Sequence, residues 1–249
     1  MITKIELEKL VEKYEKADFI LSDPVQFPHR FKTNEDIEIA AFISSLFSYG
    51  NRRIFIKKLD KLFEIMGNKP LEFLLNFEPK SLEGFNYRFA KDIDIIEVFR
   101  ILNKLYSDDG GLSSLFKYGF EQGKSIEQML QVVTDYFYSN AKSGLGQGFY
   151  HLIPNPKNKG AMKRMNMFLR WMVRKPPVDL GVWSFIPRGM LLIPLDVHVA
   201  RLSREMGLLT RSSNDFKAVF ELSENLKKFD PLDPVKFDFA IFGLGVNQD

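Results

Sequence analysis

Helical periodicity dominates this 249-residue chain and limits its possible folds more than any other feature. Apolar residues recur at intervals of three and four along most segments, and no stretch alternates apolar with polar residues as a half-buried strand does. We therefore expect an all-α fold. The pattern predicts helices over residues 4–16, 37–47, 52–66, 70–77, 92–106, 112–120, 125–139, 161–174, 197–207, 213–228 and 234–243.

Local signals mark the ends of several of these segments. Thr33 stands three residues before Asp36, a spacing typical of a helix-capping sequence. Residues 23–31 hold two prolines and are expected to form an ordered loop. Residues 143–148 and 154–160 are rich in Gly, Pro and Asn and divide the middle of the chain. The first of these turns either binds phosphate through its backbone N–H groups or is simply flexible.

The composition excludes several kinds of chemistry. The chain has no cysteine, so disulfides, thiolate zinc sites, iron–sulfur clusters and cysteine nucleophiles are excluded. The three histidines, His29, His151 and His198, are far apart in sequence, and we expect neither a metal site nor a cofactor. The N-terminus is charged, and no apolar run is long enough to span a bilayer. We expect a cytoplasmic protein with no membrane partner.

Positive charge is concentrated in the middle of the chain, although the formal net charge is only +3. Between Asp135 and Asp179 there is no acidic residue. A cationic tract of this kind suits a polyanionic partner. Its basic residues are Lys142, Lys157, Lys159, Lys163, Arg164, Arg170, Arg174 and Lys175.

Lys163 is expected in the first turn of the helix over residues 161–174. The apolar residues of this helix, Met162, Met165, Leu169, Met172 and Val173, share a face and are expected in the core. A different stripe of this helix, which we expect to be an exposed cationic edge, holds Lys163, Met167, Arg170 and Arg174. Lys163 is then either one solvated lysine among several or a nucleophile, since neighbouring cations and a helix N-terminus disfavour the ammonium form.

Asp196 follows Pro194 and Leu195 and precedes the helix expected from residue 197. An aspartate in this position is a favoured N-cap, because its carboxylate accepts backbone N–H bonds and complements the helix dipole. The sequence leaves open whether Asp196 also takes part in chemistry. His198 is expected to be a packing or hydrogen-bonding residue rather than a base.

These two regions resemble one known superfamily. Gly160-Ala161-Met162-Lys163 and Ile193-Pro194-Leu195-Asp196-Val197-His198-Val199 resemble the lysine and aspartate motifs of the helix-hairpin-helix DNA glycosylases (HhH-GPD). The separation of Lys163 and Asp196 is similar to that in the archaeal 8-oxoguanine glycosylases. Nearly the full length of the chain, including residues 23–31 and 179–183, also resembles a bacterial family described only as a domain of unknown function and regarded as a distant member of that superfamily. The superfamily's usual L-P-G-V-G hairpin is replaced here by residues 156–160, and the iron–sulfur cysteines of one branch are absent.

The resemblance implies a single two-lobed helical domain over residues 1–249, with possible lobes 31–140 and 1–30 plus 141–249. It implies a monomeric repair glycosylase with lyase activity, acting on double-stranded DNA with a damaged base such as 8-oxoguanine. Lys163 and Asp196 would be catalytic. DNA contacts would come from Tyr49, Asn51, Arg52, Lys157, Lys159, Arg164, Arg170, Arg174, His198 and Arg201.

Two other functions stay open from the sequence. A noncatalytic nucleic-acid-binding protein would keep the fold and the cationic residues without turnover. A monofunctional glycosylase would use Asp196 to activate water, with Lys163 contacting phosphate.

Overall fold

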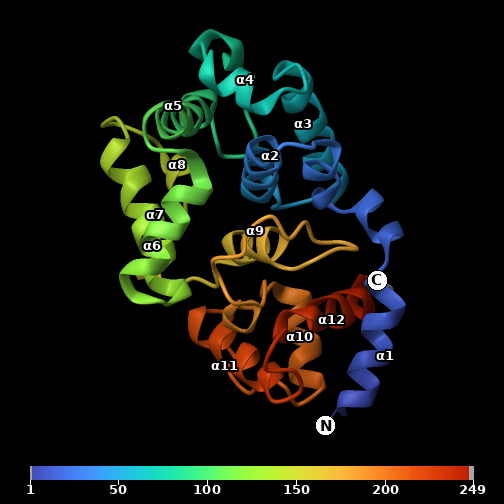
Figure 1. Cartoon of the computed structure of the whole chain (residues 1–249). Helices are drawn as coiled ribbons and strands as arrows, with labels where there is room; N and C mark the ends of the chain where they lie inside the picture. The colour runs from blue at the N-terminus through green and yellow to red at the C-terminus, as the bar shows by residue number, and fades with distance from the viewer. Residues whose placement is uncertain (1, 247–249) are drawn as a thin grey trace. The chain divides into compact units, whose positions relative to one another are not determined.

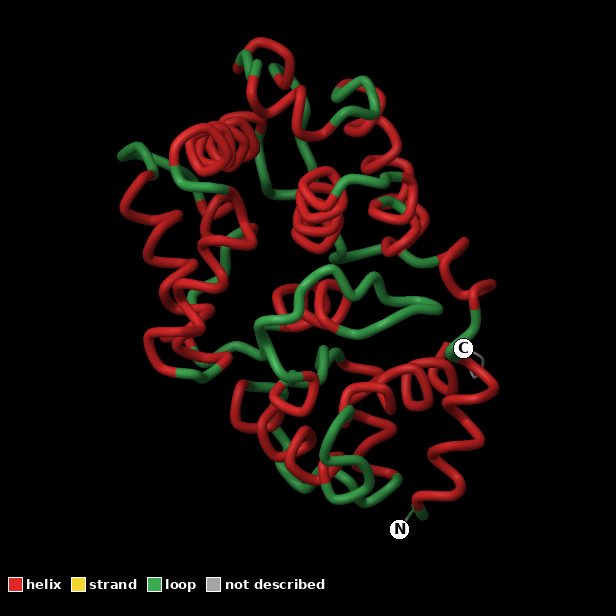
Figure 2. Tube along the Cα trace, viewed as in Figure 1, coloured by secondary structure: helices red, strands yellow, loops and turns green. Residues whose placement is uncertain are grey.

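The computed structural model describes residues 2–246, and within them it contains helices and no strand (Figures 1 and 2). The all-α prediction is confirmed. Two isolated bridges, one of which joins Gly160 to Asp215, are the only β-type pairings in this part of the chain. The structure divides into two compact units, which are described separately: unit 1 comprises Met1–Gln26 and Pro156–Asp249, and unit 2 comprises Phe27–Asn155.

Unit 2 contains seven α-helices among the described residues: α2 (Asn34–Phe47), α3 (Arg52–Ile65), α4 (Pro70–Leu75), α5 (Asp92–Asp108), α6 (Gly111–Gly123), α7 (Ile126–Asn140) and α8 (Gln147–Leu152). Helix α2 is buried from Ile37 to Phe47, which explains why its apolar residues do not keep to one face. The predicted cap at its start is confirmed, because the Thr33 hydroxyl accepts the backbone N–H of Asp36. Helices α6 and α7 pack against each other as a pair.

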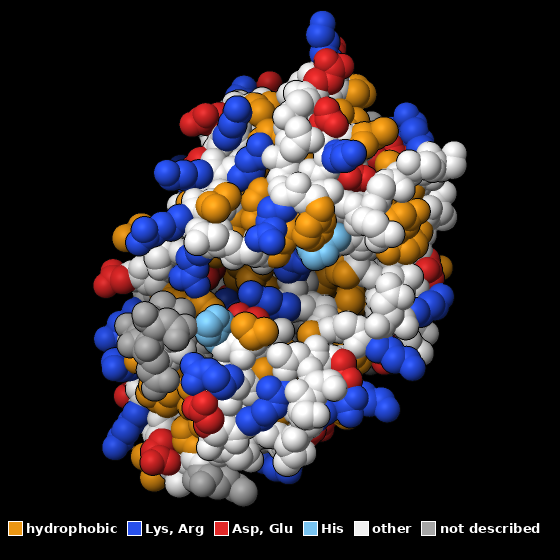
Figure 3. Space-filling view, turned by 180° about the vertical axis from the view of Figure 1, so that it is seen from behind, with side chains coloured by type: hydrophobic (Ala, Val, Ile, Leu, Met, Phe, Trp, Pro, Cys, Tyr) orange, Lys and Arg blue, Asp and Glu red, His pale blue; other side chains and the backbone are white. Residues whose placement is uncertain are grey.

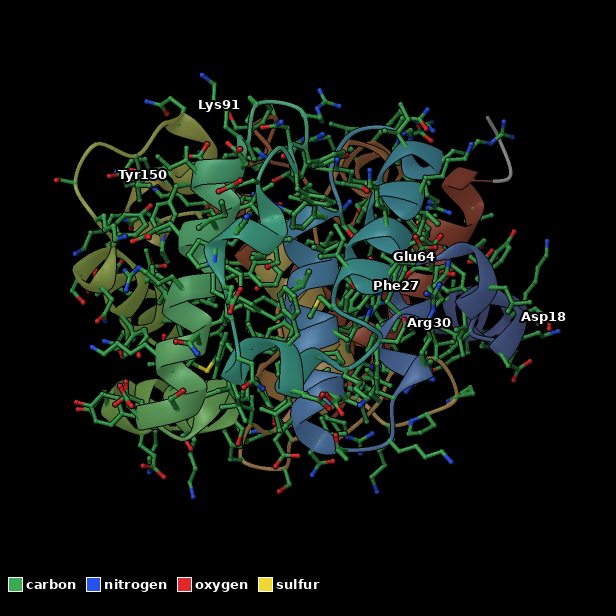
Figure 4. The ribbon with its side chains drawn as sticks, turned by 90° about the horizontal axis from the view of Figure 1, so that it is seen from above. Asp18, Phe27, Arg30, Glu64, Lys91 and Tyr150 are labelled. Carbon is green, nitrogen blue, oxygen red and sulfur yellow. The ribbon has the colours of Figure 1, made fainter. Side chains whose placement is uncertain are left out.

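The proline-containing stretch predicted as an ordered loop forms short 3-10 turns. One of these, η3 (Pro28–Arg30), packs against α2. The Phe27 ring stacks on Phe63 of α3 with 5.1 Å between centroids, and the Arg30 guanidinium lies 4.3 Å from the Phe27 centroid (Figure 4). Arg30 also pairs with Asp60 at 2.8 Å. Aromatic packing and one ion pair therefore join this turn to α3.

Unit 1 contains α1 (Lys4–Tyr14), α9 (Lys163–Val173), α10 (Val197–Glu205), α11 (Phe216–Lys227) and α12 (Phe237–Val246). Helices α1 and α10 both pack against α12. Helix α9 is buried from Arg164 to Val173. The chain that follows α9 returns to its last turn, where Leu180 and Trp183 donate backbone hydrogen bonds to the carbonyls of Trp171 and Met172. These bonds satisfy carbonyls that the helix end would otherwise leave without partners.

The predicted helices are all present, with ends that differ by a few residues. Helix α8 was not predicted, because residues 143–148 are interpreted as a turn, and this helix begins inside that stretch and is only six residues long. The predicted helix over 234–243 is divided into the 3-10 turn η7 (Pro234–Lys236) and α12. The apolar residues assigned to the core face of α9 are confirmed as buried.

Candidate active site in unit 1

Lys163 lies in the first turn of α9, as predicted, and is the first residue of this helix. The preceding residue, Met162, occupies the N-cap position with a φ of 51°, and its side chain makes no capping bond. Lys159 also has a positive φ, of 58°, and its carbonyl accepts the backbone N–H of Phe216 at 2.9 Å. This tight turn before α9 fixes where the helix begins. It leaves the Lys163 side chain 35% exposed.

Asp196 is the N-cap of α10, which confirms that prediction. Its Oδ1 accepts the backbone N–H groups of His198 at 3.0 Å and Val199 at 2.9 Å. Its Oδ2 lies 3.3 Å from Lys163 Nζ. One carboxylate oxygen therefore caps the helix and the other faces the lysine. The fold thus brings together the two residues that the sequence singles out.

The charges of this pair act on a second carboxylate, that of Asp238 on α12. It is 5% exposed, and its Oδ2 accepts a hydrogen bond from Arg170 Nη1. Burial raises the pKa of Asp238 to about 6. The positive charges of Arg170 and Lys163 act against this shift, and the negative charge of Asp196 adds to it. The charges of Lys163 and Asp196 therefore both act on the ionisation of Asp238.

The expectation that Arg170 and Arg174 form an exposed cationic edge is wrong. Both side chains are buried, and each is paired with carboxylates inside unit 1. Arg170 lies 3.2 Å from Asp179 Oδ1, and Arg174 lies 2.6 Å from Asp179 Oδ2. Arg174 further pairs with Glu15, the C-cap residue of α1, at 2.8 Å and with Asp233 at 2.9 Å. These arginines connect elements of the unit and are not available to bind phosphate.

The electrostatics of this buried network follow from its composition. Burial acts to lower the pKa of Arg170, but the charges of Asp179 and Asp238 outweigh it and the pKa is raised. The pKa of Arg174 is raised for the same reason, with Asp179 and Asp233 outweighing burial. Both guanidinium groups stay charged because carboxylates replace the water that burial removes.

The remaining basic residues proposed for DNA binding in unit 1 differ in accessibility. Arg164 is buried and therefore does not offer an open cationic surface. Lys157, Lys159, His198 and Arg201 are exposed. Arg201 pairs with Glu205 at 3.0 Å across one turn of α10. In Figure 3, basic side chains are interspersed with acidic ones over the visible face.

Tyr49, Asn51 and Arg52 lie in unit 2, at the junction between α2 and α3. The Asn51 side chain caps α3 by accepting the backbone N–H of Ile54 at 3.3 Å. Tyr49 is half-buried, and its ring packs 5.4 Å from Phe89 and 4.6 Å from His151. Phe89 is 47% exposed, so this aromatic cluster reaches the surface of unit 2.

The sequence did not single out Asp238, nor Asp179 and Asp233, the other carboxylates that bind Arg170 and Arg174. A signal for Asp238 exists, because it is an isolated acid between Phe237 and Phe239 in an otherwise apolar run. Acidic residues are rarely fully buried without a partner, so an acid in such a run indicates a buried ion pair. Asp179 and Asp233 lie outside helices and give no comparable signal.

Within residues 2–246, no helix has the length and apolar composition needed to cross a membrane. In the same part of the chain, no group of three or more His, Asp or Glu side chains is placed to hold a metal ion.

Residues 23–247 match the model of a family described as "Protein of unknown function (DUF2400)". The chain belongs to this family. The match includes Lys163, Asp196 and Asp238, and it covers all of unit 2. Among curated proteins and among solved structures, no significant match to the chain is found.

Proposed function

We propose that this protein is a DNA repair glycosylase that excises a damaged base, an oxidised purine such as 8-oxoguanine, and then cuts the strand by Schiff-base lyase chemistry. Its proposed fold is two-lobed, like that of the HhH-GPD superfamily. It would be a monomeric, cytoplasmic protein that acts on double-stranded DNA without a cofactor. The observation that carries it is the 3.3 Å contact between Lys163 Nζ and Asp196 Oδ2.

This contact supports the proposal because the chemistry requires an amine and a carboxylate together. A glycosylase first extrudes the damaged nucleotide from the duplex, since the reacting carbon is inaccessible while the base is stacked. The lone pair of the Lys163 amine then forms a bond to C1′ of the deoxyribose. The bond from C1′ to the base breaks, and the base leaves with the bonding electrons and a proton. The resulting aminal opens to a Schiff base, from which elimination releases the 3′ phosphate.

Asp196 suits the role of the carboxylate beside the nucleophile. Its Oδ1 is held by two backbone N–H groups, so its Oδ2 is kept in a fixed position beside Lys163. A carboxylate fixed in this way can orient the amine and stabilise the positive charge that develops on the sugar. Lys157 and Lys159 are exposed in the turn before α9 and are suited to contact phosphates.

The same contact favours one alternative. Lys163 and Asp196 lie at ion-pair distance, and a lysine in an ion pair can bind a phosphate without acting as a nucleophile. In a monofunctional glycosylase, Asp196 would instead activate water, and Lys163 would contact a phosphate. The two mechanisms differ in whether a covalent bond to Lys163 forms.

Borohydride trapping distinguishes them. The wild-type protein and the variants Lys163→Gln and Asp196→Asn are incubated with duplexes that contain 8-oxoguanine or an abasic site, and covalent adducts are measured after reduction. Lys175→Gln serves as the matched control, since Lys175 is an exposed lysine beyond the end of α9. We expect an adduct with the 8-oxoguanine duplex for the wild type and the control, and none for the two site variants.

The other outcomes are equally informative. An adduct with the abasic duplex alone would support lyase chemistry and contradict 8-oxoguanine as the target base. Base release without an adduct would support the monofunctional mechanism. Salt-sensitive DNA binding with neither product would support a noncatalytic binding protein.

A further inference from the structure

Three helices of unit 2 line a cavity of about 580 Å³. Helices α5, α6 and α7 pack against one another, and each contributes side chains to its wall (Figure 1). Residues 132, 135, 136 and 139 of α7 all line it, and this spacing places them on one face of the helix over two turns. The volume lies within the range of small-molecule sites, about 300–1,000 Å³.

Much of the wall is apolar. Leu105 of α5 and Leu115 of α6 line the cavity and are buried, and Val132 of α7 is half-buried. The rings of Tyr118 and Tyr136 add to this wall, and Tyr118 is 57% exposed. An apolar body placed here would remove these side chains from water, which is favourable.

Two carboxylates also line the cavity and are held in place by hydrogen bonds. Asp109, the C-cap of α5, accepts the Tyr136 hydroxyl through Oδ2 at 2.6 Å. Asp135 of α7 accepts the Gln131 amide through Oδ1 at 2.7 Å. The second oxygen of each carboxylate makes no hydrogen bond to another residue in the described range 2–246, so each can accept one from a ligand.

The charge of the wall is negative, because none of the residues that line the cavity is basic. Lys104 lies next to Leu105 in sequence, but it binds Asn140 Oδ1 at 2.7 Å and is not part of the wall. Burial raises the pKa of Tyr136, and the hydrogen bond to Asp109 adds to this effect. The phenol therefore stays neutral, and the ring faces of the two tyrosines can also attract a cation.

We propose that this cavity binds a small organic cation, a ligand with an apolar body and a protonated amine. The body would pack on Leu105, Leu115 and Val132, and the ammonium group would donate hydrogen bonds to Asp109 and Asp135. A stable protein interface needs about 20–30 residues on each side, whereas nine residues line this cavity. The negative charge also disfavours the phosphates of DNA, so the inference does not rest on the proposed function.

The test uses phenylbutylamine as the probe, with phenylbutanol and phenylbutyrate as its neutral and anionic counterparts. Binding to the full-length protein is measured by calorimetry, and the methyl resonances of Leu105, Leu115 and Val132 locate the probe by NMR. We expect the amine to bind at least about tenfold more tightly than either counterpart, since a hydrogen bond between charged groups is worth about that factor.

Three variants test the role of the carboxylates. Asp109→Asn and Asp135→Asn should each weaken binding of the amine about threefold to tenfold and leave binding of phenylbutanol unchanged. Glu127→Gln is the matched control, because Glu127 is an exposed acid of α7 outside the cavity, and it should bind the amine as the wild type does. Melting temperatures establish that each variant is folded.

Several results would overturn the proposal. These are no saturable binding of the amine below about 10 mM, equal affinity for all three probes, or an equal loss in Glu127→Gln. Size-exclusion chromatography of the same proteins tests a different occupant. A wild-type dimer that becomes a monomer in Asp135→Asn would assign the cavity to a second copy of the chain instead of a small ligand.

Discussion

Arg174 and Asp179 are five residues apart in sequence and form an ion pair of 2.6 Å in which the aspartate is fully buried. Asp179 also binds Arg170, so its loss would leave two buried arginines with fewer partners. Removing one partner of a buried ion pair costs about 3–5 kcal/mol. We expect Asp179→Asn to lower the free energy of unfolding by about this amount, as measured by urea denaturation.

The control for this variant is Glu205→Gln, which breaks the Arg201–Glu205 pair on the surface of α10. Exposed pairs contribute about 1 kcal/mol or less, so this change should have little effect. Equal losses of stability in the two variants would contradict a structural role for the buried network.

Two substitutions at Asp196 should separate its role in helix capping from its proposed role in catalysis. Asparagine caps helices about as well as aspartate, whereas alanine at an N-cap costs about 0.5–2 kcal/mol. We expect Asp196→Asn to keep nearly wild-type thermal stability and yet form no borohydride adduct, because it lacks the charge. Asp196→Ala should lose both. An Asn variant that still forms the adduct would show that the charge beside Lys163 is not required.

The raised pKa of Asp238 should make the free energy of unfolding depend on pH. Burial raises the pKa of Asp238 from 3.8 to about 6, so between these values the folded protein binds more protons than the unfolded chain. The stability from this group is complete below about pH 4 and is lost as the pH rises to about 6. A pKa shift of this size corresponds to a change of about 3 kcal/mol in the free energy of unfolding.

The variant Asp238→Asn does not titrate at this position and avoids that loss. We expect its free energy of unfolding, relative to wild type, to increase by up to about 3 kcal/mol between about pH 4 and about pH 7. Urea denaturation at several pH values measures the difference. A difference that does not change with pH would argue against a raised pKa for Asp238.

Gly148 of α8 has no room for a side chain. A Cβ at this position would collide with Asp94 Oδ2 and would lie 2.6 Å from Ala90 Cα. Because one obstacle is backbone, we expect Gly148→Ala to cost about 1–3 kcal/mol. Gly160→Ala is the matched control, since nothing lies within 4 Å of its Cβ position. It should change stability by less than about 1 kcal/mol. Similar melting temperatures for the two variants would contradict the close packing of α8.

The proposed function predicts how DNA affinity depends on salt. Each phosphate contact contributes about 0.9 to the slope of log affinity against log salt concentration. We expect Lys157→Gln with Lys159→Gln to weaken duplex binding and to reduce this slope by about 2. Fluorescence anisotropy at several salt concentrations measures both quantities. Lys175→Gln is the comparison, and an equal effect of that variant would show that binding does not depend on this turn.

The elements of the fold are largely readable from the sequence, because the period of the apolar residues records which face of each helix is buried. Thr33 and Asp196 were correctly predicted as helix caps, since capping depends on neighbours two and three residues away. The prediction failed for Arg170 and Arg174. A charged residue on the polar stripe of an isolated helix is expected at the surface, but α9 is covered on all sides.

What only the tertiary structure decided is which distant residues meet. Arg170 binds Asp238, which is 68 positions away, and Arg174 binds Glu15, which is 159 positions away. Periodicity says that a face is buried but not what covers it, because that depends on the packing of whole helices against one another. The sequence alone therefore determined the helices and the caps at Thr33 and Asp196, and a resemblance of motifs singled out Lys163 and Asp196, but their contact is a result of the tertiary structure. The burial of Asp238 and its bond to Arg170 were decided by how α9 and α12 pack within unit 1.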